Sequence, residues 1–129
     1  MSAALGCAGL AALLLSSPAS ADTELIGRVA WVSYDGSATL RVYPTAAGRE
    51  IAGDFGKTAA HSDEAWREVL ALAPDADTPG MRAQFLCHWN FAEFAAPGKT
   101  SWDLEPWRPP VGQAAMMSSG CNPGGAERG

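Results

Sequence analysis

The first twenty-one residues constrain this chain most, because an export signal would take no part in the folded domain. The stretch from Leu5 to Leu15 is uncharged and built of Leu, Ala, Gly and one Cys, and Ala19-Ser20-Ala21 follows it as an A-x-A cleavage site. This apolar run is shorter than the about 20 residues that span a bilayer. We therefore expect residues 1–21 to be a signal peptide. Residues 22–129 are then expected to form one small secreted domain without stable membrane insertion.

Cleavage would remove Cys7 and leave two cysteines, Cys87 and Cys121. Two cysteines permit one intramolecular pairing, and in an oxidising compartment a disulfide is the default, worth about 3 to 4 kcal/mol of stability. The alternative is a reactive thiol. Because there is no CxxC pair and the two histidines stand at unrelated positions, we predict no metal site.

All charged side chains lie after residue 21, nine Lys and Arg against fourteen Asp and Glu, and the net charge is −5. A nucleic-acid partner needs a basic face, so none is expected. The scattered glycines form no phosphate-binding motif, and we expect no cofactor. The core must depend on four Phe, five Trp and two Tyr, because much of the remaining apolar content is Ala.

Two runs at the start of the mature chain predict a β-hairpin. Residues 25–34 and 39–43 are rich in apolar and β-branched residues, and Asp35-Gly36 between them is typical hairpin-turn chemistry. The next segment, residues 45–60, is rich in Gly and Ala. It predicts a loop with a short strand around Ile51.

Two helices are predicted next. The first has Ser62 as its cap, acidic residues in its first turn and apolar residues at helical spacing, and it ends at Pro74. The second has Thr78 as its cap and Pro79 as its first residue. The apolar stripe of the second helix consists of Met81, Phe85 and Trp89.

The C-terminal third contains many prolines, so residues 96–112 are predicted to be irregular. Residues 111–119 are predicted as a short helix ended by Gly120, and the tail from Asn122 as mobile. The fold class is therefore α+β: an antiparallel β-hairpin or small sheet packed against two or three helices, with one disulfide.

Three motifs, with the sequences DTPGM (77–81), QFLCHW (84–89) and WDLEPWRP (102–109), resemble those of a family of small exported bacterial proteins. That family is catalogued as a domain of unknown function. The resemblance covers most of the mature chain. It implies an exported, compact domain that carries the Cys87 and Cys121 pair, and it assigns no substrate, cofactor or catalytic residue.

The third motif also supplies candidate binding residues, which are Trp102, Trp107 and Arg108. A proline-rich loop loses little entropy on ordering and can present aromatic rings to a partner. In the alternative interpretation Trp102, Leu104 and Trp107 cover the core from a loop, and Arg108 pairs with Asp103 or Glu105.

The favoured function is a non-catalytic binding module for a protein or cell-envelope partner. One alternative is a small exported hydrolase in which His88 acts with Asp103 or Glu105, which requires these side chains to converge. A further alternative is a secreted protease inhibitor, although the sequence shows no identifiable reactive-site peptide. No catalytic residue is assigned, and an enzymatic role is the less favoured interpretation.

Overall fold

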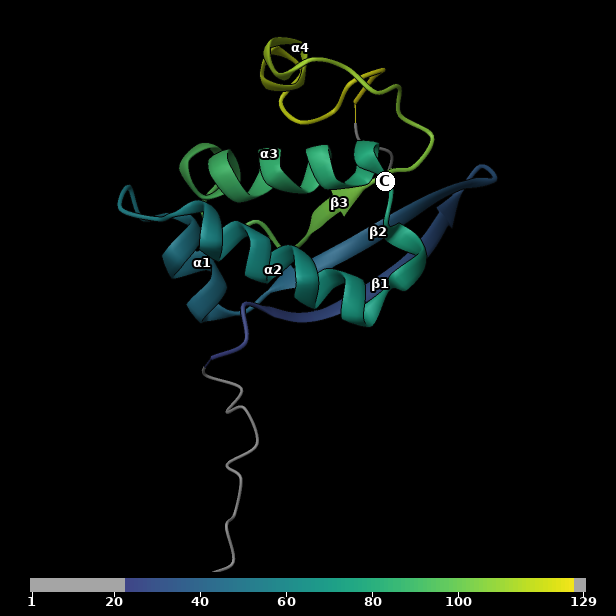
Figure 1. Ribbon diagram of the computed structural model, residues 1–129. Coiled ribbons are helices and arrows are strands. Elements are labelled where there is room, and N and C mark those ends of the chain that lie inside the picture. The colour runs from purple at the N-terminus through teal and green to yellow at the C-terminus, as the bar shows by residue number, and fades with distance from the viewer. Residues whose placement is uncertain (1–22, 127–129) are drawn as a thin grey trace, which may run out of the picture.

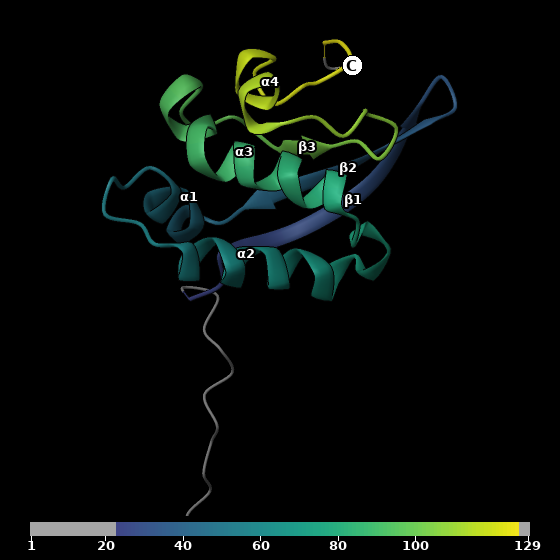
Figure 2. The same cartoon turned by 45° about the horizontal axis from the view of Figure 1, so that its top comes forward.

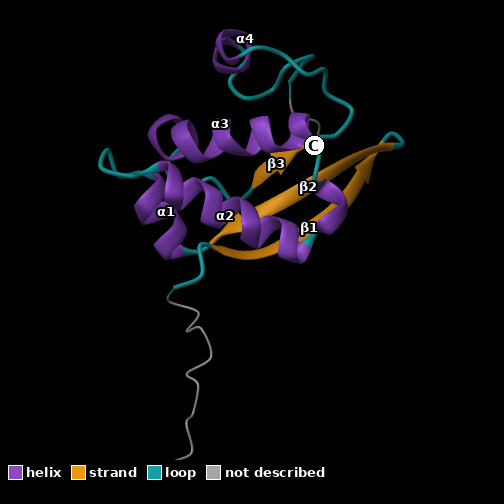
Figure 3. Ribbon diagram, viewed as in Figure 1, coloured by secondary structure: helices purple, strands orange, loops and turns teal. Residues whose placement is uncertain are grey.

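The computed structural model describes residues 23–126, and the predicted signal peptide lies outside the described residues. A three-stranded antiparallel sheet in the order β1-β2-β3 forms one layer and helices form the other, which confirms the α+β class (Figures 1 and 3). In chain order the elements are β1 (Ile26–Tyr34), β2 (Ser37–Pro44), α1 (Ala46–Ala52), α2 (Ala59–Leu72), the 3-10 turn η1 (Pro74–Ala76), α3 (Pro79–Ala95), β3 (Trp102–Leu104) and α4 (Gln113–Ser118).

The predicted hairpin is confirmed, and its turn explains the tight connection between β1 and β2. Asp35 and Gly36 have φ angles of 49° and 79°. Positive φ at both central residues is what a two-residue hairpin turn of the I′ type requires, because its twist matches that of the strands. β2 also pairs with β3, and this places Leu40 opposite Leu104 and Val42 opposite Trp102.

The third strand does not come from the region around Ile51, so that prediction was wrong. Residues around Ile51 form α1, whose N-cap Thr45 accepts a hydrogen bond from the backbone N–H of Gly48 at 2.9 Å. The third strand is β3, inside the segment predicted to be irregular. It fits between the prolines because it is only three residues long.

The predicted helices exist, but the first begins earlier than Ser62. α2 starts at Ala59 after the cap residue Thr58, whose backbone N–H donates to His61 Nδ1 at 3.2 Å. Ser62 lies within the helix, where its hydroxyl donates to the carbonyl oxygen of Ala59 at 2.9 Å. α3 begins as predicted at Pro79.

α2 and α3 pack over the same face of the sheet (Figures 1 and 2), and the main core lies between the two layers. Trp89 and Trp102 meet edge to face, with ring centroids 6.1 Å apart, and Trp66 lies 5.4 Å from Phe85. Such aromatic pairs gain energy beyond their area burial. The predicted stripe of α3 is therefore a core stripe, and its three members are at most 1% exposed.

α4 lies on the far side of α3 from α2 (Figures 1 and 2). The predicted disulfide between Cys87 and Cys121 is present and joins α3 to the segment after α4. A second, separate cluster of buried residues forms around the disulfide, consisting of Cys87, Met116 and Cys121 with Ala83 and Val111 packed against it. α3 is thus covered on both sides.

Candidate functional site

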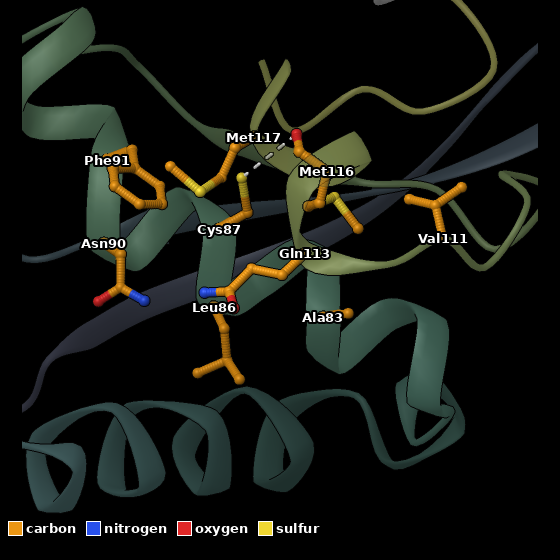
Figure 4. A pocket seen from close by; sticks show the side chains of 9 residues that line it. All are labelled: Ala83, Leu86, Cys87, Asn90, Phe91, Val111, Gln113, Met116 and Met117. Atoms are coloured by element: carbon orange, nitrogen blue, oxygen red, sulfur yellow. Dashed lines mark hydrogen bonds between the residues drawn. The ribbon is translucent and has the colours of Figure 1, made fainter. Parts of the chain in front are cut away.

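An apolar groove lies between α3 and the α4 segment and is here named the α3–α4 groove. It consists of two hollows of about 240 and 350 Å³. Leu86, Val111 and Met116 line the first hollow (Figure 4), and the second extends past His88 and Lys99 toward Cys121.

Three residues line both hollows, namely Cys87, Phe91 and Met117. Figure 4 shows the Met117 side chain extending toward the ring of Phe91, with Cys87 beside it. The two side chains therefore form a ridge that divides the groove. Met is unbranched and polarizable, so a ridge that contains it can adapt to the shape of a ligand.

Exposed apolar side chains lie in the groove and elsewhere on the same helix. Met117 and Phe91 are 50% and 38% exposed, Phe94 is 43% exposed, and Phe55 is 92% exposed. Phe91 and Phe94 lie three positions apart on α3 and share a side of it, and Phe94 packs against Phe55 with ring centroids 5.0 Å apart. Contiguous exposed apolar surface of this kind marks interaction sites more often than scattered apolar residues do.

A buried ion pair holds the loop that carries the third motif. Glu105 and Arg108 have side chains 2% and 0% exposed, and Arg108 Nη2 lies 2.8 Å from Glu105 Oε1. The other carboxylate oxygen, Oε2, accepts from Thr39 Oγ1 at 2.8 Å and from Trp107 Nε1 at 3.1 Å. This arrangement confirms the predicted pairing of Arg108 with an acid of its own loop, and every polar contact of the carboxylate serves the fold.

Arg108 also holds the C-terminal segment through main-chain atoms. Its Nη1 donates to the carbonyl oxygens of Pro123 at 2.9 Å and Gly125 at 2.5 Å. The part of the predicted mobile tail that is described is therefore hydrogen-bonded to the domain. Mobility of the tail itself stays a prediction.

A side chain of α3 binds the backbone of the residue that directly follows β3. Gln84 of α3 donates through Nε2 to the carbonyl oxygen of Glu105 at 2.9 Å, and its Oε1 accepts from the Glu105 N–H at 2.8 Å. The buried amide thus satisfies both backbone groups of Glu105, as a neighbouring strand would.

The three predicted binding residues occupy different environments. The Trp102 side chain is fully buried in the core and that of Arg108 in the ion pair, so neither is at the surface of this conformation. Trp107 is half-buried, and the guanidinium of Arg108 lies 4.5 Å from its ring centroid. Binding through these residues stays a prediction, while their burial supports the core-covering interpretation for Trp102.

The residues of the predicted hydrolase have structural contacts. His88 is buried with Nδ1 2.8 Å from the carbonyl oxygen of Gln84. Asp103 accepts from Ser101 Oγ at 2.8 Å, and Glu105 is fully used as described above. Because structural contacts occupy the Glu105 carboxylate, Asp103 is the acid that remains for the hydrolase hypothesis. The hydrolase and the protease inhibitor both stay predictions.

Sequence reasoning missed Phe91, Phe94 and Met117. The signal in the sequence was that Phe91 and Phe94 do not belong to the buried stripe of α3, so a second apolar surface of this helix had to face something else. Phe55 in a predicted loop gave no such signal. Among residues 23–126 no group of three or more His, Cys, Asp or Glu is placed to hold a metal, and no helix is long and apolar enough to cross a membrane.

The fold and the groove together define a small α+β domain. Its disulfide between Cys87 and Cys121 lies beside an apolar surface groove. The chain belongs to the family described as "Protein of unknown function (DUF2599)", whose model matches residues 26–124. The predicted membership of a family of unknown function is therefore confirmed. The matched region includes the disulfide and both sides of the groove.

Mycobacterial proteins are similar to this chain. "Uncharacterized protein Rv0477" of Mycobacterium tuberculosis (strain ATCC 25618 / H37Rv) is 53% identical over 104 residues, which are 81% of this chain and 69% of the relative. "Uncharacterized protein ML2452" of Mycobacterium leprae (strain TN) is 45% identical over 97 residues, which are 75% of this chain and 77% of the relative. No solved structure matches the chain.

Proposed function

We propose that this protein is a non-catalytic binding module and that the α3–α4 groove is its ligand site. The observation that carries the proposal is the exposed apolar ridge of Phe91 and Met117 between two hollows. Burial of such side chains against a partner removes apolar surface from water, which is the main favourable term in association. The second hollow, of about 350 Å³, lies within the range of small-molecule pockets, and the first lies just below it.

The occupant that fits best is a peptide segment of a partner protein with two apolar anchor side chains. Two hollows on either side of a ridge match two anchors on one segment, as in the recognition of amphipathic peptides by apolar grooves. Met116 and Met117 give the adaptable wall that such grooves use. The groove also offers polar side chains, Asn90 and Gln113, which can accept and donate hydrogen bonds to a peptide backbone.

A displayed library of short random peptides, selected against the immobilised full chain, tests this proposal. We expect enrichment of peptides with two large apolar side chains. Binding of the best synthetic peptide, measured by calorimetry, should weaken at least about tenfold, or about 1.4 kcal/mol, in Met117→Lys, because the charge replaces the ridge contact.

Leu72→Lys is the matched control, because Leu72 is also 50% exposed and lies on α2, away from the groove. It should leave the affinity unchanged. Equal affinity of wild type and Met117→Lys would remove the groove as the site. Displacement of every selected peptide by a simple fatty acid would show that the site takes acyl chains and would refute the peptide occupant.

Trp107 is proposed as a second contact with the peptide, because it is the one binding candidate from the sequence whose side chain is partly exposed. In the same binding assay, Trp107→Ala should lower the affinity for the peptide, while the melting temperature of the protein falls little. A large fall of the melting temperature with unchanged affinity would make Trp107 a structural residue only.

Export is also part of the proposed function. It is supported by the leader pattern of residues 1–21 and by the Cys87–Cys121 disulfide, which persists in oxidising compartments. Mass spectrometry of the protein from culture medium should find a chain that begins at residue 22 and has no free thiol. An intact leader together with free thiols at Cys87 and Cys121 would contradict export.

A further inference from the structure

The α4 segment is packed on the domain separately from the main core. Among the described residues, the buried members of the main core all lie between Leu25 and Leu104. The segment after Val111 contributes instead to the second cluster, whose buried members are two bridged cysteines and Met116. The covalent bond is therefore the centre of the contact between α4 and α3.

The same segment has a second, independent attachment at its base. Arg108 binds the carbonyl oxygens of Pro123 and Gly125, so residues 109–122 form a loop whose two ends are held together without the disulfide. We name residues 109–122 the C-terminal lid. Breaking the disulfide would remove the covalent tie between this lid and α3 and leave the Arg108 contacts and the main core in place.

We infer that the Cys87–Cys121 disulfide is a redox switch for the α3–α4 groove, an inference that rests on the proposed function of that groove. The oxidised protein holds the lid against α3 and presents Met116 and Met117 as one wall of the groove. Reduction releases this wall, so the ligand is held by α3 alone and dissociates. Preorganisation of a binding site contributes to affinity, and loss of the lid removes it.

The reductant is a dithiol of the thiol–disulfide exchange class. Its thiolate attacks one sulfur of the bridge, the S–S bond breaks, and a mixed disulfide forms. The second thiol of the reductant then displaces the protein thiol from this mixed disulfide. Two electrons pass, the reductant ends as a disulfide, and Cys87 and Cys121 end as thiols.

The groove and the bridge are coupled in both directions. Cys87 lines both hollows and Cys121 lines one, so a peptide seated in the groove covers the bridge. A ligand that binds the oxidised form better must stabilise that form by the same free energy. Bound peptide therefore disfavours reduction at equilibrium, and because it covers the bridge it also slows the attack of the thiolate.

The test combines amide hydrogen exchange and peptide binding on the full chain, with and without dithiothreitol. We expect reduction to accelerate exchange in residues 111–121 while β1, β2 and α2 stay protected, and to weaken the selected peptide about tenfold. A double variant, Cys87→Ala with Cys121→Ala, should match reduced wild type and should not respond to dithiothreitol. Saturating peptide should lengthen the half-life of the disulfide in dithiothreitol.

Unchanged exchange in residues 111–121 after reduction would overturn the inference, because the lid would not depend on the bridge. Loss of protection throughout the domain would also overturn it, because no separate lid would exist. Loosening of the lid without any change in peptide affinity would refute the switch alone. If no peptide binds the oxidised chain, the proposed function fails, and exchange still decides whether the bridge holds the lid.

Discussion

At the scale of single residues, the third motif is explained by a buried network and not by a surface patch. Glu105 is an unusual residue to bury, and its carboxylate is paired with the Arg108 cation and accepts hydrogen bonds from Thr39 and Trp107. A charge removed from water costs several kcal/mol unless it is paired and hydrogen-bonded. The sequence allowed this pairing as one of two interpretations, but spacing alone could not show which acid Arg108 meets.

Arg108→Met should destabilise the domain by about 3 to 5 kcal/mol, because it leaves the Glu105 carboxylate buried without its cation. Urea unfolding followed by Trp fluorescence measures the change. Arg67→Met is the matched control. Arg67 also pairs with a glutamate three residues away, Glu64, but the side chains of that pair are 68% and 52% exposed, so its loss should leave stability almost unchanged. Similar losses in both variants would show that the buried network is not important for stability.

At the scale of elements, the long apolar stripe and the hairpin were predictable, and α1 was not. The stripe of α3 and the Asp35-Gly36 turn each combine a local signal with a clear periodicity. α1 has a weak helical signal because Gly48 lies within it, and Gly disfavours helix interiors. Its position is set instead by tertiary contact, since a Cβ at Gly48 would lie 2.1 Å from the carbonyl oxygen of Leu25.

Gly48→Ala should therefore lower stability, although alanine has the higher helix propensity. The methyl group would collide with the backbone at Leu25, and one of the two segments must move. Gly80→Ala in the first turn of α3 is the control, because a Cβ at Gly80 would meet no atom within 4 Å, and it should stabilise the fold by up to about 1 kcal/mol. Thermal unfolding compares the two. A rise in melting temperature for Gly48→Ala would contradict the close approach.

At the scale of the whole molecule, the sequence predicted the class and the covalent link but not the site. The two cysteines after residue 21 left one intramolecular bridge, and a hairpin followed by a run of helices favoured α+β, so these features followed from counting and periodicity. The α3–α4 groove depends on how a segment near residue 117 returns to a helix near residue 91. Such a long-range juxtaposition leaves no trace in local spacing. The proposed site depends on which apolar side chains face solvent, and the sequence shows the residue types without showing their exposure.

The contact of Gln84 with Glu105, directly after β3, bears on how this protein behaves at high concentration. Proteins can aggregate when a strand of one molecule pairs with an unpaired edge strand of another, and natural proteins protect such edge strands. Here one amide from a helix takes the place that an incoming strand would need at Glu105. While Gln84 holds Glu105, a strand of a second molecule cannot form these two hydrogen bonds with it.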